Sequence, residues 1–135
     1  MRRARDVDEM KQERLPIKNR HFDVLSFKHT WIVPAIVVRV IDGDTVVVHM
    51  EVMPGLVLHE AHVRVQGINA PEMNTFSGRA SYAVAQSLLP VNAVIRIIME
   101  DTDKYGRVLG KIKMTDGRDF GTVMVDGGSA VEYNP

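Results

Sequence analysis

Several features that would narrow the class of protein are missing from this chain of 135 residues. It has no cysteine, so disulfides and thiolate metal ligands are excluded. Its formal net charge is zero and only 6% of its residues are aromatic, so the overall composition does not point to nucleic-acid binding. No apolar run approaches the ~18 residues of a membrane-spanning helix, and we expect no membrane contact. What is present is 45% apolar residues, which is enough for one folded core.

The charge is unevenly distributed, and the unevenness divides the chain near Trp31. Residues 1–30 carry a formal charge of +3 and residues 31–135 carry −3. The first part shows no strong apolar periodicity, so we expect an N-terminal arm over residues 1–30 and one folded domain over residues 31–135. The N-terminus lacks the apolar segment of a signal peptide. We therefore expect a cytoplasmic protein, with a secreted mature form left open.

From Ala35 onward the pattern is typical of a small β-protein. Segments rich in β-branched or alternating apolar residues predict five strands, at 36–41, 45–50, 56–68, 94–99 and 108–114. Apolar residues at helical spacing predict a helix from Gly78 to Leu89, and Asp119 is the expected N-cap of a short helix through Asp126. We therefore predict a mainly β fold with helices (α+β). It is a five-stranded OB-fold barrel, with one helix between strands 3 and 4 and a short helix after strand 5.

Polar segments interrupt these strands, and each has a plain structural explanation when taken alone. Asp42-Gly43-Asp44 is typical of a hairpin turn, because glycine accepts a positive φ. Arg64 alternates with buried-type valines and would simply face solvent. Pro71-Glu72 is typical of a turn, and the run Asp103 to Arg107 of a polar loop.

Taken in order, the same segments supply the groups that hydrolysis of a phosphodiester bond requires. Asp44 can bind a hard cation, and Glu72 can accept a proton from an attacking water molecule. Arg64 and Arg107 can each hold two phosphate oxygens with a planar fork of donors. Pro71 stiffens the backbone beside Glu72. The sequence therefore favours a metal-assisted nuclease site, provided that folding brings these segments together.

The order and spacing of four of these segments resemble the staphylococcal nuclease family. The similar segments are Val40-Ile41-Asp42-Gly43-Asp44-Thr45-Val46, Val63-Arg64-Val65, Ala70-Pro71-Glu72 and Thr102-Asp103-Lys104-Tyr105-Gly106-Arg107. The similarity covers roughly residues 35–133. Members of this family are OB-fold barrels with helices, and they cut DNA and RNA with calcium.

The resemblance implies a role for each matching residue. Asp44, Asn69 and the backbone carbonyl of Ala70 would bind Ca²⁺, and Asp42 and Thr45 would support these ligands from behind. The resemblance implies the following catalytic residues: Glu72 as general base, with Arg64 and Arg107 stabilising the transition state. It also implies the following nucleotide contacts: Lys104, Tyr105 and Tyr133. The substrate would be DNA or RNA in single-stranded or frayed form, cut to leave a 3′-phosphate.

One departure from the family leaves a second function open. Asn69 stands where the family has an aspartate, so one negative charge is missing and we expect weaker calcium binding. The alternative is a nucleic-acid-binding OB-fold module with weak or lost catalysis. A protein-interaction module is less favoured, because it gives the arginines and Glu72 no common task. His49, His59 and His62 lie on neighbouring predicted strands, but their spacing is not that of zinc ligands.

Overall fold

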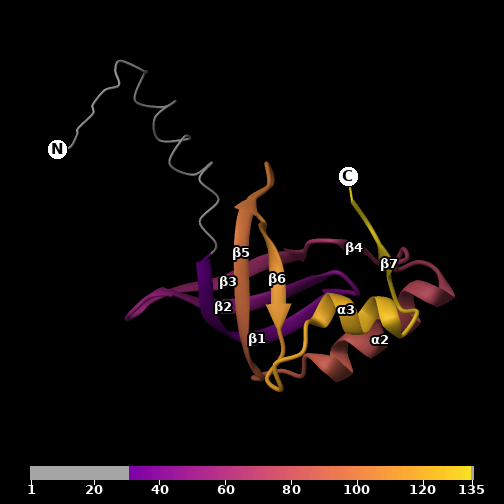
Figure 1. Cartoon of the computed structure of the whole chain (residues 1–135), viewed down its shortest axis with the longest axis horizontal. Coiled ribbons are helices and arrows are strands. Elements are labelled where there is room, and N and C mark those ends of the chain that lie inside the picture. The colour runs from indigo at the N-terminus through magenta and orange to yellow at the C-terminus, as the bar shows by residue number, and fades with distance from the viewer. Residues whose placement is uncertain (1–30, 135) are drawn as a thin grey trace, which may run out of the picture.

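The computed structural model describes residues 31–134, which form a barrel with two helices packed beside it (Figure 1). The elements in chain order are β1 (Trp31–Asp42), β2 (Thr45–Met53), β3 (Leu56–Val65), β4 (Ile68–Asn69), α2 (Phe76–Leu88), β5 (Val94–Thr102), β6 (Val108–Lys113), α3 (Phe120–Asp126) and β7 (Val131–Glu132). No helix among the described residues is long and apolar enough to cross a membrane. The arm expected over residues 1–30 lies outside the described part of the chain.

Five strands close into a barrel in the order β1-β2-β3-β6-β5. Neighbouring strands run antiparallel, except that β3 and β6 pair in parallel and thereby close the barrel. Along β1 and the second half of β3 buried residues alternate with exposed ones, so that one face of each strand fills the interior, whereas Thr45 to Val48 of β2 are buried on both faces. The predicted five-stranded α+β barrel is therefore confirmed.

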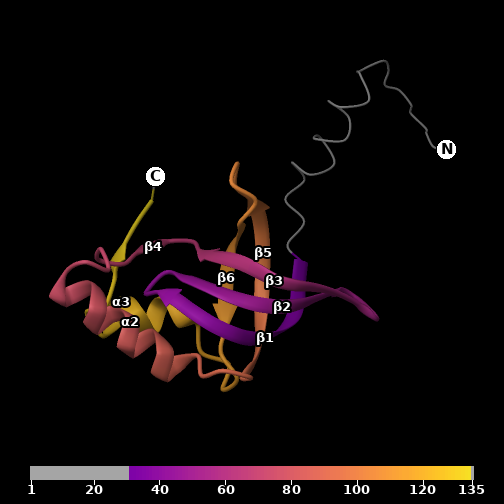
Figure 2. The same cartoon turned by 180° about the vertical axis from the view of Figure 1, so that it is seen from behind.

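The two longer helices lie on the same side of the barrel, away from the β5–β6 loop (Figures 1 and 2). Thr75 caps α2 by accepting a hydrogen bond from the backbone N–H of Gly78, and Asp119 caps α3 by accepting one from Thr122. Helix α3 contributes the fully buried Phe120 and Met124 to the core. The predicted short helix, its N-cap and its end at Asp126 agree with the structure.

Several boundaries differ from the prediction. Strand β1 begins at Trp31 rather than at Ile36, and β2 and β5 each extend three residues beyond their predicted ends. The run predicted as one strand over 56–68 is divided into β3 and β4, because Gly67 adopts a φ of +86° that no extended strand continues through. Helix α2 begins at Phe76, two residues before the predicted start, because the capping residue is Thr75. The short sheet of β4 and β7 was not predicted at all, since a strand of two residues carries no periodicity.

Candidate active site

The tight turn between β1 and β2 presents the carboxylate of Asp44 in a nearly buried position. Asp44 is 7% exposed, and its Oδ1 accepts a hydrogen bond of 3.0 Å from Thr45 Oγ1. Its Oδ2 accepts one of 2.8 Å from the backbone N–H of Ala70, 26 residues further along the chain. Behind it, Asp42 Oδ1 accepts a hydrogen bond of 3.0 Å from the backbone N–H of Asp44. Asp42 and Thr45 therefore hold Asp44 in place through these hydrogen bonds.

The two carboxyl groups of this turn have pKa values that move in opposite directions. Burial and the neighbouring Asp44 raise the pKa of Asp42 to about 6. Burial alone would raise the pKa of Asp44 as well, but hydrogen bonds from Asp42 and Ala70 and the charge of Arg64 lower it below 3.8. The pair titrates together, and Asp44 is the carboxyl group that loses its proton first as the pH rises.

Gly43 lets the turn approach α2 and the chain after β4. A Cβ at this position would lie 2.0 Å from Ser81 Oγ and 2.8 Å from the Ala70 Cβ. Ser81 is itself 2% exposed, and its hydroxyl has no hydrogen-bond partner within residues 31–134. Only a residue without a side chain allows the β1–β2 turn to contact Ala70 this closely.

Arg64 lies near the end of β3 and contacts the same carboxylate oxygen of Asp44 as the Ala70 N–H does. Its Nη2 lies 3.5 Å from Asp44 Oδ2 and donates a 2.9 Å hydrogen bond to Asn69 Oδ1. Its Nη1 donates to two backbone carbonyls, those of Val65 and, at 3.0 Å, Ile68. The guanidinium group is thus fixed by four acceptors, and its side chain is 17% exposed.

Asn69 and Ala70 are held beside Asp44 by the small second sheet. Asn69 in β4 pairs with Val131 in β7, and Ala70 follows it directly with its N–H bound to Asp44. The structure therefore places residues Asp44, Asn69 and Ala70 next to one another, with Arg64 in contact with Asp44 and Asn69. Tyr133 follows β7, and its N–H donates to the Gly67 carbonyl at 2.9 Å, so that its half-exposed side chain belongs to the same region.

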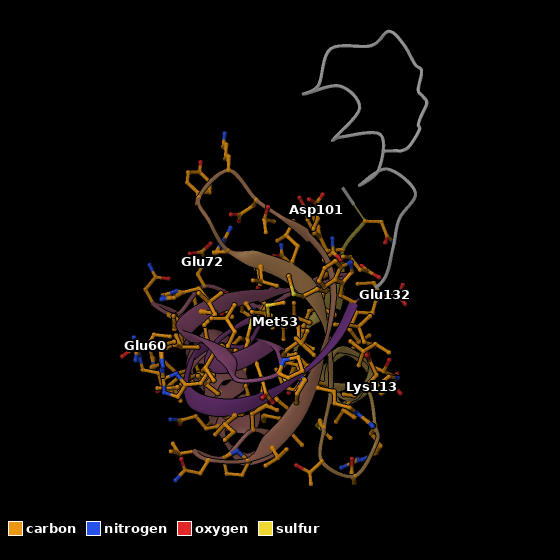
Figure 3. All side chains as sticks on the ribbon, turned by 90° about the vertical axis from the view of Figure 1, so that its left-hand side faces the viewer. Met53, Glu60, Glu72, Asp101, Lys113 and Glu132 are labelled. Atoms are coloured by element: carbon orange, nitrogen blue, oxygen red, sulfur yellow. The ribbon has the colours of Figure 1, made fainter. Side chains whose placement is uncertain are left out.

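Glu72 lies on the segment that leads from β4 to α2, and its carboxylate is exposed. Its backbone carbonyl accepts hydrogen bonds from the N–H of Thr75 at 3.1 Å and from the Thr75 hydroxyl at 2.6 Å. A Cβ on Gly78 would lie 1.8 Å from the same carbonyl. The capping residue and the glycine of α2 therefore fix the backbone of Glu72, while its side chain is free to reach a substrate. Figure 3 shows Glu72 toward the same end of the barrel as Asp101 and away from Lys113.

The loop between β5 and β6 is organised around Asp103, to which the sequence analysis gave no role. Asp103 Oδ1 accepts hydrogen bonds from the backbone N–H groups of Tyr105 and Arg107, and its Oδ2 accepts one of 2.7 Å from Arg107 Nε. Desolvation opposes the shift, but these hydrogen bonds and the arginine charge lower the pKa of Asp103 below 3.8. The sequence contains a signal for this contact, because Asp103 precedes Arg107 by four residues in a segment that includes Gly106.

The same loop exposes an aromatic side chain between two cations. Tyr105 is 74% exposed, Lys104 Nζ lies 5.3 Å from its ring centroid and Arg107 Cζ lies 6.0 Å from it. Both distances are within the range of cation–π attraction. The three side chains form one exposed surface that suits a base and its phosphate.

The parallel pairing of β3 and β6 determines where Arg64 and Arg107 lie relative to each other. Val63 pairs with Val108 and Arg64 pairs with Leu109, so Arg107 enters β6 one residue before the first of these pairs. The valines are buried, which turns both arginines to the outer face of the barrel. Strand spacing then separates their Cα atoms by roughly 8 Å, a span that the two long side chains can close around one phosphate.

The oxygen atoms near Asp44 suit a hard cation, although few of them come from side chains. One carboxylate and one amide oxygen already face a positive group, the guanidinium of Arg64. All the candidate donors are oxygens, which suit calcium or magnesium. In the described part of the chain no three His, Cys, Asp or Glu side chains gather as a metal site. A bound ion would therefore take most of its ligands from the backbone, water and substrate.

The histidines contribute no zinc site within residues 31–134. His49 and His59 contact each other edge to face with ring centroids 4.9 Å apart. The His49 Nδ1 accepts a 3.1 Å hydrogen bond from the backbone N–H of Glu60. These contacts give His49 a structural role on the barrel surface.

Comparisons with known proteins point to one family, although the range matched by the family model does not include Asp42, Asp44 and Thr45. The family model described as staphylococcal nuclease homologue matches residues 62–135, a range that includes Arg64, Glu72 and Arg107. A protein of Escherichia coli named "uncharacterized endonuclease" is 35% identical over 97 residues, which are 72% of this chain and 59% of that protein. A protein of the same name from Escherichia coli O157:H7 matches to the same extent. "Protein ParB" of Escherichia coli is 38% identical over 77 residues, 56% of this chain and 39% of that protein. The chain thus spans 59% of the length of the two endonuclease-named relatives.

Proposed function

This chain belongs to the staphylococcal nuclease family, and on that premise we propose that it is a calcium-dependent phosphodiesterase that cuts DNA or RNA. One observation carries the proposal. The Arg64 guanidinium contacts both Asp44 and Asn69, so a group suited to phosphate lies against groups suited to a cation. A single phosphate could therefore contact an arginine and an ion bound at Asp44 at the same time.

Asp44, Asn69 and the Ala70 carbonyl would hold the calcium ion. When bound, the ion would neutralise charge on the phosphate oxygens. Arg64 is fixed by backbone carbonyls and is therefore already oriented before substrate arrives. Arg107 is likewise oriented by Asp103. Donors held in place strengthen most as negative charge grows on the equatorial oxygens of a five-coordinate phosphorus.

Glu72 would be the general base. It would accept a proton from the water molecule that attacks phosphorus, and the bond to the leaving oxygen would break as the new P–O bond forms. Its exposed carboxylate and fixed backbone are consistent with this role. Lys104, Tyr105 and Tyr133 would contact the nucleotide through charge and stacking.

A second candidate function is supported by Asn69. The amide supplies no charge, and its oxygen is occupied by Arg64. A module of this kind would bind single-stranded nucleic acid without cutting it, as OB-fold barrels do. The same chain would then respond to salt but produce no fragments.

The first prediction concerns Glu72. Glu72→Gln should reduce calcium-dependent cutting by about 100-fold or more, because the amide does not accept the proton from water. The measurement is the release of fragments from an end-labelled single-stranded oligonucleotide, with calcium and with a chelator.

Glu60→Gln is the matched control, because Glu60 is an exposed glutamate of β3 whose side chain pairs only with the exposed Arg39. It should cut at the parental rate. Equal cutting by Glu72→Gln and Glu60→Gln would remove the general-base role. Binding without any fragments from the parent would favour the second candidate function.

A further inference from the structure

Helix α2 begins with an aromatic side chain that packing does not explain. Phe76 is 80% exposed, whereas Phe120, the first residue of α3, is 2% exposed. Both are phenylalanines at the first helical position, but only one contributes to the core. An apolar ring left in water gains free energy when it is covered, and a flat ring is best covered by another flat ring.

The position of Phe76 is fixed relative to Glu72. Thr75, which directly precedes it, donates to the Glu72 carbonyl and accepts from Gly78. Gly78 leaves no room between α2 and that carbonyl. The start of α2 and the segment carrying the candidate base are therefore held together, and the backbone of Phe76 keeps a fixed position close to Glu72.

Arg79 lies on the same face of α2. It is three residues after Phe76, a separation that places two side chains next to each other on a helix. It is the only charged residue of α2, it is exposed, and its side chain has no partner within residues 31–134. A base-stacking ring next to an arginine is the combination that binds single-stranded nucleic acid.

The β5–β6 loop and α2 approach the site from different sides. Figures 1 and 2 show the end of β3, which carries Arg64, between that loop and the start of α2. Tyr105, 74% exposed, lies in the β5–β6 loop, and Phe76 lies at the start of α2. A strand whose phosphate binds between the arginines would extend past one aromatic residue on each side.

We infer that Phe76 and Arg79 form a second nucleotide subsite, on the Glu72 side of the cut phosphate. Phe76 stacks on the base of the adjacent nucleotide, and Arg79 pairs with the phosphate that follows it. This inference rests on the proposed function for its ligand, single-stranded nucleic acid. It assigns to α2 a task in substrate binding beyond its packing on β1.

The experiment measures binding separately from cutting. All proteins carry Glu72→Gln, and the probe is a fluorescent single-stranded DNA oligonucleotide in calcium, followed by anisotropy. Phe76→Ala should weaken binding about 5- to 50-fold, the usual loss for one stacked base, and Phe76→Trp should restore it. The control is Val84→Ala, which shortens another exposed apolar side chain of α2 and should change the dissociation constant less than twofold.

A single abasic residue moved along the oligonucleotide locates the subsite. At one position the abasic residue should weaken binding to the Glu72→Gln protein. At that same position it should hardly weaken binding to the Phe76→Ala variant any further. The logarithm of the binding constant falls linearly with the logarithm of the salt concentration, and Arg79→Gln should make this slope about 0.7 less steep. Arg96→Gln, at another exposed arginine, should leave the slope unchanged.

Equal binding by Phe76→Ala and Val84→Ala, or an abasic effect that persists in Phe76→Ala, would overturn the inference. Failure of the wild-type chain, with Glu72 intact, to cut would overturn the proposed catalysis alone, because binding is read independently. Absence of any binding to the oligonucleotide would overturn both.

Discussion

At the scale of single residues, Asn69 lowers the negative charge of the candidate calcium site relative to an aspartate at that position. Asp44 is negative, Arg64 is positive, and the raised pKa of Asp42 reduces its charge near neutral pH. Asn69 contributes an oxygen but no charge, and that oxygen accepts a hydrogen bond from Arg64. The free energy of calcium binding depends on the number of charged ligands, so this chain should bind calcium weakly.

The second prediction follows from this balance. Asn69→Asp should lower the calcium concentration for half-maximal cutting by roughly tenfold, because a divalent ion gains more from the new charge than Arg64 does. Calorimetric titration of calcium checks the binding directly. Asn92→Asp adds the same charge at an exposed turn residue away from the site and should leave the midpoint unchanged. A midpoint that stays the same in Asn69→Asp would show that position 69 does not face the ion.

At this scale the sequence predicted residue types better than contacts. The carboxylates, arginines and Glu72 could be chosen from their order and from the family resemblance. The hydrogen bond from Ala70 to Asp44 joins residues 26 apart, and the contact of Arg64 with Asn69 depends on where Gly67 ends the strand. Contacts of this kind follow from the fold and have no local pattern.

At the scale of elements, two connections position Glu72 and Arg107, the proposed base and one of the two proposed phosphate-binding arginines. The segment from β4 to α2 fixes Glu72 through Thr75 and Gly78, and the β5–β6 loop fixes Arg107 through Asp103. Both were predicted as turns from glycine, proline and polar residues. The internal hydrogen bonds that make them rigid, and the strands β4 and β7, were not predicted, because they involve too few residues to produce a pattern.

The third prediction tests the β5–β6 loop. Asp103→Asn keeps an acceptor for the backbone N–H groups but removes the charge that holds Arg107. The value of kcat/KM for oligonucleotide cutting should fall about fivefold, since the partly exposed ion pair that orients Arg107 is of modest strength.

Asp116→Asn provides the comparison for this loop. Asp116 accepts hydrogen bonds from the backbone N–H and the Nε of Arg118 in a similar turn, between β6 and α3. This variant should retain parental kcat/KM. Equal losses in the two variants would mean that the effect comes from general loosening of turns.

At the scale of the whole molecule, closing the barrel assembles the site. The β1–β2 turn, the end of β3 and the start of β6 meet only because β3 pairs with β6 in parallel. The period of two in the strands and the helical period at α2 were enough to predict this architecture. The order of strands around the barrel was not predicted, because periodicity does not show which strands pair.

The fourth prediction compares two phenylalanines at equivalent helix positions. Phe120→Ala should lower the free energy of unfolding by about 3–5 kcal/mol, because it opens a cavity where α3 packs on the barrel. Phe76→Ala should change it by less than ~0.5 kcal/mol, because that ring is exposed. Urea unfolding followed by circular dichroism measures both. Similar losses in the two variants would contradict the placement of these helices.

The central claim is that Asp44, Arg64, Glu72 and Arg107 surround one pocket that holds a cation beside a phosphate. A crystal structure with calcium and a nucleoside 3′,5′-bisphosphate tests it most directly. We expect the ion within about 2.6 Å of an Asp44 carboxylate oxygen, and a phosphate that contacts the ion, Arg64 and Arg107 together. An ion bound away from Asp44, or a phosphate that contacts only one of the two arginines, would contradict the account.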